Sequence, residues 1–493
     1  MAENTDNVVN ASVEEAKFKV GTLAYTKRGL FMLFIYLLWG DFCFTLMESV
    51  FPAVTPLTLG KLGASSLLVG LVMTTIPNIF NAIVCPWVSF KSDRHRSKMG
   101  RRIPFLLYPT PFISLFLILI GLAPEIGRFL ARTILHSAGY TQTAIILGLI
   151  AVLSVAYQYF NMFVASVYYY LFNDVVPENY LSRFMSAFRL VGIIAGAVFN
   201  FFIFRYAESH MKWIFIGCGL LYFVAFTMMS LKVKEGEYPP PPEYVGGKQG
   251  PLAALKTYFT ECFNDKFWWT FFIGTAAADL IAIAYPFILQ MQRYSLGLDP
   301  KQIGYINGVA GIVTAALVLP AGWLADKRHP LQIQLWATLV LFLLTPTRII
   351  YLLHNFTPAE AYRIEFALQM ILIPATAVYV VSSLPMYMRV LPSDRFGQFC
   401  SAQAMFRSVV GIFSGMILGE SLDLIAKVCK AHGLAANYNL RYAFLWQTLC
   451  WGVSFILLAK LYKMWKGYGG EDGYVPPGTE HPTLEESSTT IIS

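Results

Sequence analysis

Twelve long apolar runs dominate this chain of 493 residues, and they constrain its fold more than any other feature. A helix needs roughly 20 apolar residues to cross a bilayer, so each run is long enough to span one. Charged residues make up only 13% of the chain, about half the fraction found in soluble domains. We therefore exclude a water-soluble globular enzyme and predict a multi-pass membrane protein. The predicted spans are 29–53, 65–89, 104–124, 142–172, 184–206, 212–231, 267–290, 302–324, 332–353, 363–390, 399–425 and 441–462.

The spans form two groups of six, separated by a polar segment that contains four consecutive prolines. Such a proline run excludes a helix and favours an extended linker. We expect an all-α integral membrane protein built from two pseudo-symmetric six-helix bundles. Its expected parts are a cytosolic tail over 1–28, a first bundle over 29–231, a cytosolic linker with an amphipathic segment over 232–266, a second bundle over 267–462 and a disordered cytosolic tail over 463–493.

The distribution of basic residues predicts the orientation. With a cytosolic N-terminus, 25 of the 37 Lys and Arg residues fall on the cytosolic side and 12 on the other side. This bias follows the positive-inside rule, so both termini are expected in the cytosol and the protein in a plasma or bacterial inner membrane. The net charge of +8 does not indicate nucleic-acid binding, because the basic residues lie at the ends of apolar runs.

The loop after the second span, KSDRHRSKMGRRIP (91–104), carries six basic residues. Taken alone, it has a simpler interpretation as a positive-inside loop. A shorter echo, GWLADKR (322–328), follows the eighth span, so the two loops occupy the same place in each half. We therefore predict a cytosolic gate whose charged hydrogen bonds exchange between conformations. Its predicted members are Asp93, Arg94, Arg101, Arg102, Asp326 and Arg328.

A second internal repeat joins the segments that lead into the fifth and eleventh spans. VVPENYLSRFMSAFRLVGIIAG aligns with VLPSDRFGQFCSAQAMFRSVVGIFSG, so that Arg189 corresponds to Arg407 and two Gly-xxx-Gly pairs coincide. Parallel repeats of this kind build transporters whose substrate site lies at the midplane between the halves. The glycine pairs have a simpler interpretation as points of close helix approach.

Ionisable residues within the spans mark the candidate site, because they are costly at membrane depth. Asp41 and Glu48 lie seven residues apart in the first span and therefore share one helix face. Carboxyl groups in a low-dielectric environment are suited to take up and release a proton near neutral pH. We expect Asp41 and Glu48 to couple transport to proton movement. Asp279 lies at the corresponding depth of the seventh span.

Other polar residues extend the predicted substrate pocket. Trp39 has two interpretations, since it can stack on a sugar ring or face the core or lipid. Arg189 needs an acceptor at its depth, which is either a substrate hydroxyl, a carboxylate of the pocket, or Asp174 in a structural ion pair. The predicted substrate-binding residues are Trp39, Asp41, Tyr157, Asn161, Arg189, Asp279 and Gln369.

The sequence contains none of the common enzyme motifs. It lacks a Walker A motif, HExxH, a GxSxG elbow and GxGxxG in a strand–helix context. We therefore expect no catalytic residues, no cofactor and no metal. The missing Walker A motif also argues against a primary ATP-driven pump.

At SDRHRSKMGRRIPF and its echo GWLADKR, the chain resembles the major facilitator superfamily. WGDF in the first span, CPWVSFKSDRHRSKMGRRIPF after the second and NDVVP before the fifth are similar to the glycoside-pentoside-hexuronide cation symporters, in particular their branch of proton-coupled sucrose carriers. The resemblance implies sugar-binding roles for Asp41 and Arg189. It also disfavours sodium, because Asn81 and Cys85 stand where the melibiose permeases carry two sodium-binding carboxylates.

The sequence thus predicts a twelve-span secondary active transporter. We expect it to carry a glycoside or disaccharide, sucrose- or maltose-like, in symport with protons by alternating access. The expected partners are a small-molecule sugar, the proton and the lipid bilayer, with no nucleic acid, and the chain is expected to be a monomer. Two alternatives stay open: an uncoupled facilitator or exporter of another small solute, and a transporter-like sensor that does not transport.

Overall fold

The computed structural model describes residues 18–133, 141–238, 262–326, 328–392 and 395–477. Within these ranges helices predominate, and the sheet is one antiparallel pair, β1 (Lys19–Val20) with β2 (Leu23–Ala24). Eleven described helices are long and apolar enough to cross a membrane. A further helix, α13 (Pro300–Asp326), stands where the sequence predicts the eighth span. The prediction of an all-α membrane protein is therefore confirmed.

The first half contains the first six predicted spans, although α2 and α6 continue eight and nine residues beyond the predicted ends at 53 and 124. Its elements are α2 (Lys27–Lys61), α3 (Ser66–Gly70) continued by the π-helical turn η1 (Leu71–Thr75) into α4 (Ile76–Arg94), α5 (Ile103–Leu107), α6 (Thr110–Thr133), α7 (Gln142–Val175), α8 (Glu178–Val198) continued by η3 (Phe199–Ile203) and η4 (Phe204–Tyr206), and α9 (Met211–Lys232).

The second half contains the other six spans, several of which are interrupted. Its elements are α11 (Lys266–Asp279), the 3-10 turn η5 (Leu280–Ala284), α12 (Tyr285–Gln290), η6 (Met291–Ser295), α13, α14 (Pro330–Leu344), η7 (Thr345–Ile349), α15 (Ile350–Leu353), α16 (Pro358–Val390), α17 (Phe396–Ala431), η8 (Tyr438–Tyr442), α18 (Ala443–Gly467) and α19 (Gly470–Gly473).

Short polar residues start several of these helices. The side chains of Thr26 and Thr141 accept backbone N–H groups from the first turns of α2 and α7. Thr357 and Glu360 form a reciprocal capping box at the start of α16. These caps satisfy N–H groups that have no partner inside the helix, so local sequence sets where the spans begin.

Aromatic side chains pack the interior of each half. Tyr168 lies between Phe44 and Phe226, with ring centroids 5.4 and 5.3 Å away, and so joins α7 to α2 and α9. In the second half, Trp268 packs on Phe399 at 4.6 Å and joins α11 to α17. Because lipid tails are as apolar as these side chains, the association of the spans depends on close packing.

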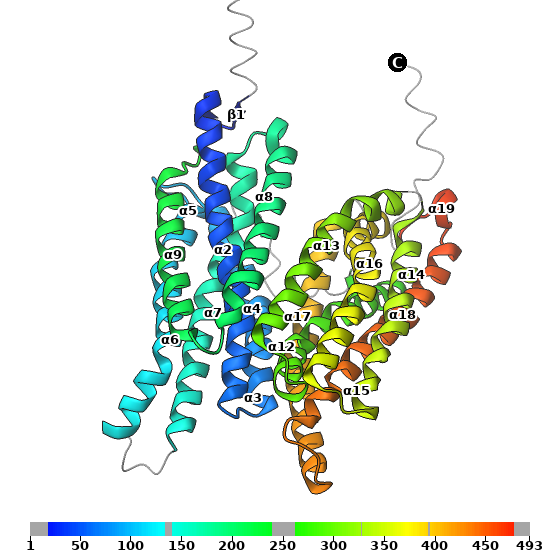
Figure 1. Ribbon diagram of the computed structural model, residues 1–493. Coiled ribbons are helices and arrows are strands. Elements are labelled where there is room, and N and C mark those ends of the chain that lie inside the picture. Colours follow the sequence, from blue (N-terminus) through cyan, green and yellow to red (C-terminus); the bar gives the residue numbers. More distant parts are fainter. Residues whose placement is uncertain (1–17, 134–140, 239–261, 327, 393–394, 478–493) are drawn as a thin grey trace, which may run out of the picture.

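The two halves lie side by side, as Figure 1 shows. They meet near α3 and α12 and diverge toward the end that carries β1 and α19. We call the first end the joined face and the second end the termini face. Helix α2 packs on α12, while α3, η1 and α4 pack on α17, and α8 packs on α13. The halves are therefore held together at the face that lies away from both termini.

Glycines line both seams between the halves. One seam lies between α17 and the segment from α3 to α4, and the other lies between α13 and the segment from α8 to η4. Gly411, Gly415 and Gly419 lie at four-residue spacing on α17, and Gly415 faces threonine side chains of η1 so closely that a Cβ there would overlap them. Gly304 and Gly308 of α13 contact η3 in the same way. Close helix approach therefore explains the glycines of α17, as expected for small residues at helix interfaces.

The matching glycines of the first half behave differently. A Cβ at Gly196 would meet no described atom within 4 Å, and one at Gly192 would meet only the Thr45 side chain, at 3.9 Å. The glycines that match in the sequence repeat therefore do not have matching roles in packing. At the seam between α8 and α13, the closely packed glycines are Gly304 and Gly308 of α13.

The C-terminal tail was predicted to be disordered from 463, but its first part is ordered. Helix α18 continues to Gly467, and the Tyr474 hydroxyl donates a hydrogen bond to the Val390 carbonyl at 2.8 Å. The Tyr474 ring also packs near Phe267 and Trp465, which accounts for this order. Residues 478–493, and 239–261 of the predicted linker with most of its amphipathic segment, lie outside the described residues.

Candidate functional site

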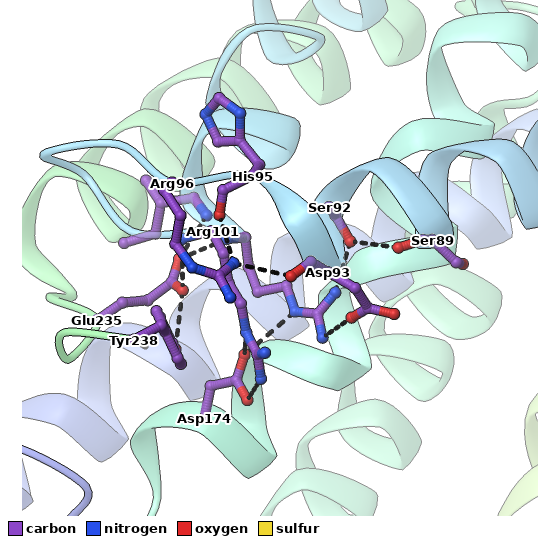
Figure 2. Close-up of polar contacts among 11 residues, drawn as sticks. Ser89, Ser92, Asp93, His95, Arg96, Arg101, Asp174, Glu235 and Tyr238 are labelled. Carbon is purple, nitrogen blue, oxygen red and sulfur yellow. Dashed lines mark hydrogen bonds and ion pairs between the residues drawn. The ribbon is translucent and has the colours of Figure 1, made fainter. Parts of the chain in front are cut away.

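A charged cluster lies at the termini face, where α4 ends and α5 begins (Figure 2). Buried Arg102 forms ion pairs with Asp93 and, at 3.1 Å, with Asp174 of the last turn of α7. Arg102 also donates a hydrogen bond to the Ser92 hydroxyl. Arg101 binds the same Asp174 carboxylate through bonds of 2.9 and 2.6 Å. Two guanidinium groups therefore share one carboxylate, an arrangement of strong charge-assisted bonds.

Glu235, just after α9, binds the same loop from the other side (Figure 2). Its carboxylate accepts the backbone N–H groups of Arg101, Arg102 and Ile103 at 2.9, 2.8 and 2.7 Å. These N–H groups lie at the start of α5, where they have no partner within the helix. The Tyr238 hydroxyl donates to Glu235 at 3.0 Å, and its ring lies 4.2 Å from the Arg101 guanidinium.

The electrostatics of the cluster keep its donors protonated. Hydrogen bonding to Asp174 raises the pKa of the Arg101 guanidinium, which therefore stays charged. Burial, followed by the nearby Glu235 carboxylate, raises the pKa of the Tyr238 phenol, so its hydroxyl remains a donor. The cluster thus anchors the first residues of the segment that follows α9 to the loop before α5.

The predicted gate residues are only partly brought together. The described partners of Asp93, Arg101 and Arg102 belong to the first half or to the segment just after α9, and none belongs to the second half. The Arg94 guanidinium lies 4.1 Å from the Phe90 ring centre. Arg328 is exposed near the start of α14. The Asp326 side chain lies outside the described residues. Exchange of these bonds with the second half stays a prediction.

Glu48 lies near the middle of α2, where it is exposed. Its Oε1 accepts a hydrogen bond of 2.7 Å from Nδ2 of Asn161 on α7. Pro52 lies one turn further on, and a proline lacks the N–H that would bind the Glu48 carbonyl. The helix therefore has a weakened hydrogen-bond ladder at the residue that carries the acid.

Asp41 has a different environment from Glu48. It is only 1% exposed, and Thr45 donates a long hydrogen bond of 3.5 Å to its Oδ1. Its Oδ2 is buried and has no partner among the described residues. A charged carboxylate with an oxygen in that situation is costly unless a proton or an unseen partner compensates.

Three other predicted pocket residues have different surroundings from this pair. Tyr157 is buried against Phe51, with ring centroids 4.5 Å apart. Trp39 is nine residues from Glu48, so helical geometry places it on the opposite side of α2. Gln369 is half-buried on α16 and makes no hydrogen bond with a described residue. The structure therefore does not bring Trp39 to the carboxyl groups of α2.

Arg189 is exposed on α8 and makes no hydrogen bond or ion pair with any residue that the structure describes. Its alternative partner, Asp174, is bound by Arg101 and Arg102 instead. The structural ion pair of Arg189 with Asp174 is therefore not formed. The positive charge of Arg189 stays available at the depth of the predicted pocket.

The second half holds an ion pair at a break in its first span. Asp279 is the last residue of α11, where the α-helix changes to the 3-10 turn η5. Its carboxylate accepts a hydrogen bond of 3.2 Å from Nε2 of Gln403 and lies 3.6 Å from the Arg407 guanidinium. Sequence reasoning named Asp279 but missed Gln403. The four-residue spacing of Gln403 and Arg407, which places them on one face of α17, was the available signal.

A cavity of ≈ 450 Å³ lies where α4 meets α17, lined by Asn81, Cys85, Tyr170 and Ser408 among others. Asn81 Nδ2 donates to the Ser408 hydroxyl at 3.0 Å and so joins the halves. These lining groups are neutral, and a hard cation prefers charged oxygen ligands. Among the described residues, no group of three or more His, Cys, Asp or Glu is placed to hold a metal ion.

The comparisons with known proteins agree with this architecture. The family described as Major Facilitator Superfamily matches residues 37–415. The sucrose transport protein SUT5 of Oryza sativa subsp. indica is 42% identical over 59 residues, and the match covers 12% of this chain and only 11% of that protein.

Two solved structures are similar in fold. A bacterial homolog of the human lysosomal transporter Spinster, inward-facing and occupied, superposes with a TM-score of 0.62 at 12% identity, over 92% of this chain and 100% of that one. A bacterial homologue of the iron transporter ferroportin, inward-facing, superposes with a TM-score of 0.61 at 13% identity, over 88% and 99%. At such identities the likeness shows the fold alone.

Proposed function

The chain belongs to the Major Facilitator Superfamily, a family of membrane transporters of small solutes, and we propose that it carries a glycoside or disaccharide in symport with protons by alternating access. The observation that carries this proposal is the exposed Glu48 carboxyl in the middle of α2, hydrogen-bonded to Asn161. An ionisable group at that depth is costly, and its exposure there fits a polar path through the first half.

The sugar part of the proposal rests on hydrogen-bonding chemistry. Sugar hydroxyls both donate and accept, and the exposed or partly exposed Glu48, Asp279 and Arg407 offer acceptors and a donor at membrane depth. The 59-residue match to a sucrose transport protein supports the same substrate class. We accordingly propose membership of the sucrose-carrier branch of the glycoside-pentoside-hexuronide symporters.

The proton part rests on the two carboxyl groups of α2. Glu48 is exposed and can exchange a proton with water, whereas the Oδ2 atom of Asp41 is buried without a described partner. We propose that Glu48 carries the coupling proton and that Asp41 binds substrate or tunes that exchange. Neutral Asn81 and Cys85 in the cavity beside α17 favour a proton over sodium.

The proposed orientation places the termini face in the cytosol. The excess of basic residues on that side supports it. The halves are joined at the opposite face, so the described conformation would be inward-facing, which fits the inward-facing state of the two similar solved structures.

The test is uptake of labelled sucrose into proteoliposomes, with and without an inside-alkaline pH gradient. Accumulation that collapses with a protonophore, and that Glu48→Gln abolishes, supports the proposal. Equilibration that ignores the gradient would instead establish an uncoupled facilitator. No entry of sucrose would reject this substrate, and a panel of glycosides and hexuronides would follow.

A further inference from the structure

We propose that Arg293 and Glu208 form a latch that holds the joined face closed and that opens once in each transport cycle. The inference rests on the proposed function, because alternating access requires the joined face to open. It assigns a role in the cycle to residues that lie outside the candidate site. Among the described residues, the charged hydrogen bonds that join the two halves lie at this face.

The pair itself has the strongest geometry. Arg293 belongs to η6 of the second half, and Glu208 lies in the loop between η4 and α9 of the first half. The Arg293 guanidinium donates two hydrogen bonds to the Glu208 carboxylate. One runs from Nε to Oε1 at 2.6 Å, and the other from Nη2 to Oε2 at 2.7 Å. Such a two-pronged bond between a planar guanidinium and a carboxylate fixes both distance and orientation. The side chains are 25% and 16% exposed, so water can reach them when they separate.

Neighbouring residues on the same helix face reinforce the pair. The Tyr294 hydroxyl donates to the Leu57 carbonyl and lies 3.3 Å from the Glu208 carboxylate. Gln290 donates to the Pro56 carbonyl at 2.7 Å. Residues three and four apart share one side of a helix, so Gln290, Arg293 and Tyr294 present a single polar edge to the first half.

A second tie lies on the other seam at the same face. The Asp423 carboxylate of α17 accepts the backbone N–H groups of Ser66 and Leu67 at 2.8 and 2.9 Å, where α3 begins. Both seams are therefore tied by a carboxylate at the joined face. The charged cluster of the termini face differs, since Arg101 and Arg102 have described partners in their own half.

A latch must be strong enough to select one state and weak enough to open. Partly exposed ion pairs meet this need, because each separated charge regains water and the net cost of opening is modest. We therefore expect loss of the pair to change the ratio of open to closed joined faces on the order of tenfold, while leaving each half folded.

The experiment measures the joined face directly and needs no substrate. Spin labels are attached to cysteines that replace Arg132 and Lys301. Both residues are exposed, at the ends of α6 and α13 that lie toward the joined face. The full chain is reconstituted in nanodiscs after alanine replaces Cys85 and Cys400, the cysteines that are partly exposed. Pulsed electron resonance then gives the distribution of distances between the labels.

Glu208→Gln is expected to raise the population with the longer label distance roughly tenfold relative to the unsubstituted chain. The charge swap that combines Glu208→Arg with Arg293→Glu should return the population toward the closed state. Glu125→Gln is the matched control, because Glu125 pairs with Lys212 at 3.0 Å within the first half. This control should leave the distances unchanged.

An unchanged distance distribution in Glu208→Gln would overturn the latch. Arg293→Gln provides a second variant should Glu208→Gln fail to fold, as judged by size-exclusion chromatography, and an unchanged distribution there would overturn the proposal equally. Failure of the proposed function is distinguishable, because it would show as absent sucrose uptake in the unsubstituted chain, while the effect of Glu208→Gln on the distances would persist.

Discussion

Nδ2 of Asn161 lies 2.7 Å from Oε1 of Glu48, so an amide of α7 holds an exposed carboxyl group near the middle of α2. This bond joins the first and fourth spans at membrane depth. The amide can donate to a carboxylate or, after rotation, accept from a carboxylic acid, so the contact tolerates both protonation states. It is therefore suited to a residue that gains and loses a proton.

Glu48→Gln should abolish uphill transport and retain downhill exchange. Glutamine keeps the size of the side chain and its bond to Asn161 but cannot release a proton. We expect accumulation driven by a pH gradient to fall at least tenfold, as is typical when a proton-transfer group is lost. Counterflow of labelled sucrose measures exchange separately. Gradient-driven accumulation at the original level would exclude Glu48 as the coupling group.

Asp174→Asn should destabilise the protein far more than Asp93→Asn. The Asp174 side chain is 10% exposed and binds two guanidinium groups, whereas that of Asp93 is 57% exposed and pairs with one. Removing the partner of a buried charge costs about 3 kcal/mol, and an exposed pair contributes below about 1 kcal/mol.

Thermal unfolding in detergent measures this difference. Asp93→Asn should unfold near the temperature of the unsubstituted chain and yet transport more slowly, as expected of a gate residue. Equal losses of stability in the two variants would show that burial does not separate their roles, and undiminished transport by Asp93→Asn would remove it from the gate.

Glu235→Gln should release the segment after α9 from the loop before α5. The carboxylate accepts three backbone N–H groups at the start of α5, and a neutral amide satisfies them less well. We expect the amides of residues 101–103 to exchange hydrogen roughly tenfold faster, which corresponds to about 1.4 kcal/mol of local stability. Glu237→Gln is the control, since Glu237 is exposed and contributes its backbone N–H to the described contact with Thr22. Matching exchange rates in the two variants would count against the anchor.

Gly415→Ala and Gly196→Ala should have opposite effects. In the interior of a helix, alanine is favoured over glycine by about 1 kcal/mol. A Cβ at Gly196 meets no described atom within 4 Å, so that variant should be slightly stabilised. A Cβ at Gly415 would overlap the Thr74 side chain across the seam between the halves, so that variant should unfold at a lower temperature. Similar midpoints for both variants would show that the seam can move apart at no cost.

The number of spans and their approximate positions could be predicted from the sequence. A membrane helix satisfies its own backbone hydrogen bonds, so its length depends on the local run of apolar residues. The predicted span 142–172, for example, corresponds to α7, which continues three residues further. The predicted span 332–353 corresponds to the helical segment from α14 to α15, Pro330–Leu353. The exposed end of α18 was missed, because aromatic contacts from Tyr474 extend order beyond the apolar run.

The candidate site was only partly predictable. Spacing along one helix placed Asp41 and Glu48 on the same face, but it could not tell that Asp41 is buried and Glu48 exposed. That difference depends on which neighbours each residue meets in α7, α8 and α9. In the same way, spacing along the chain could not tell that Asp174 pairs with Arg101 and Arg102 and not with Arg189.

By itself, the sequence determined that this is a protein of membrane-spanning helices arranged in two related halves, since apolar length and helix caps act within a few residues. The tertiary structure alone decided which charges meet, as in the bonds from Glu235 to Arg101, 134 residues apart, and from Arg293 to Glu208, 85 residues apart. A hydrogen bond needs its atoms within about 3 Å. Such precision comes from the packing and rotation of whole helices, which no local stretch of the chain encodes.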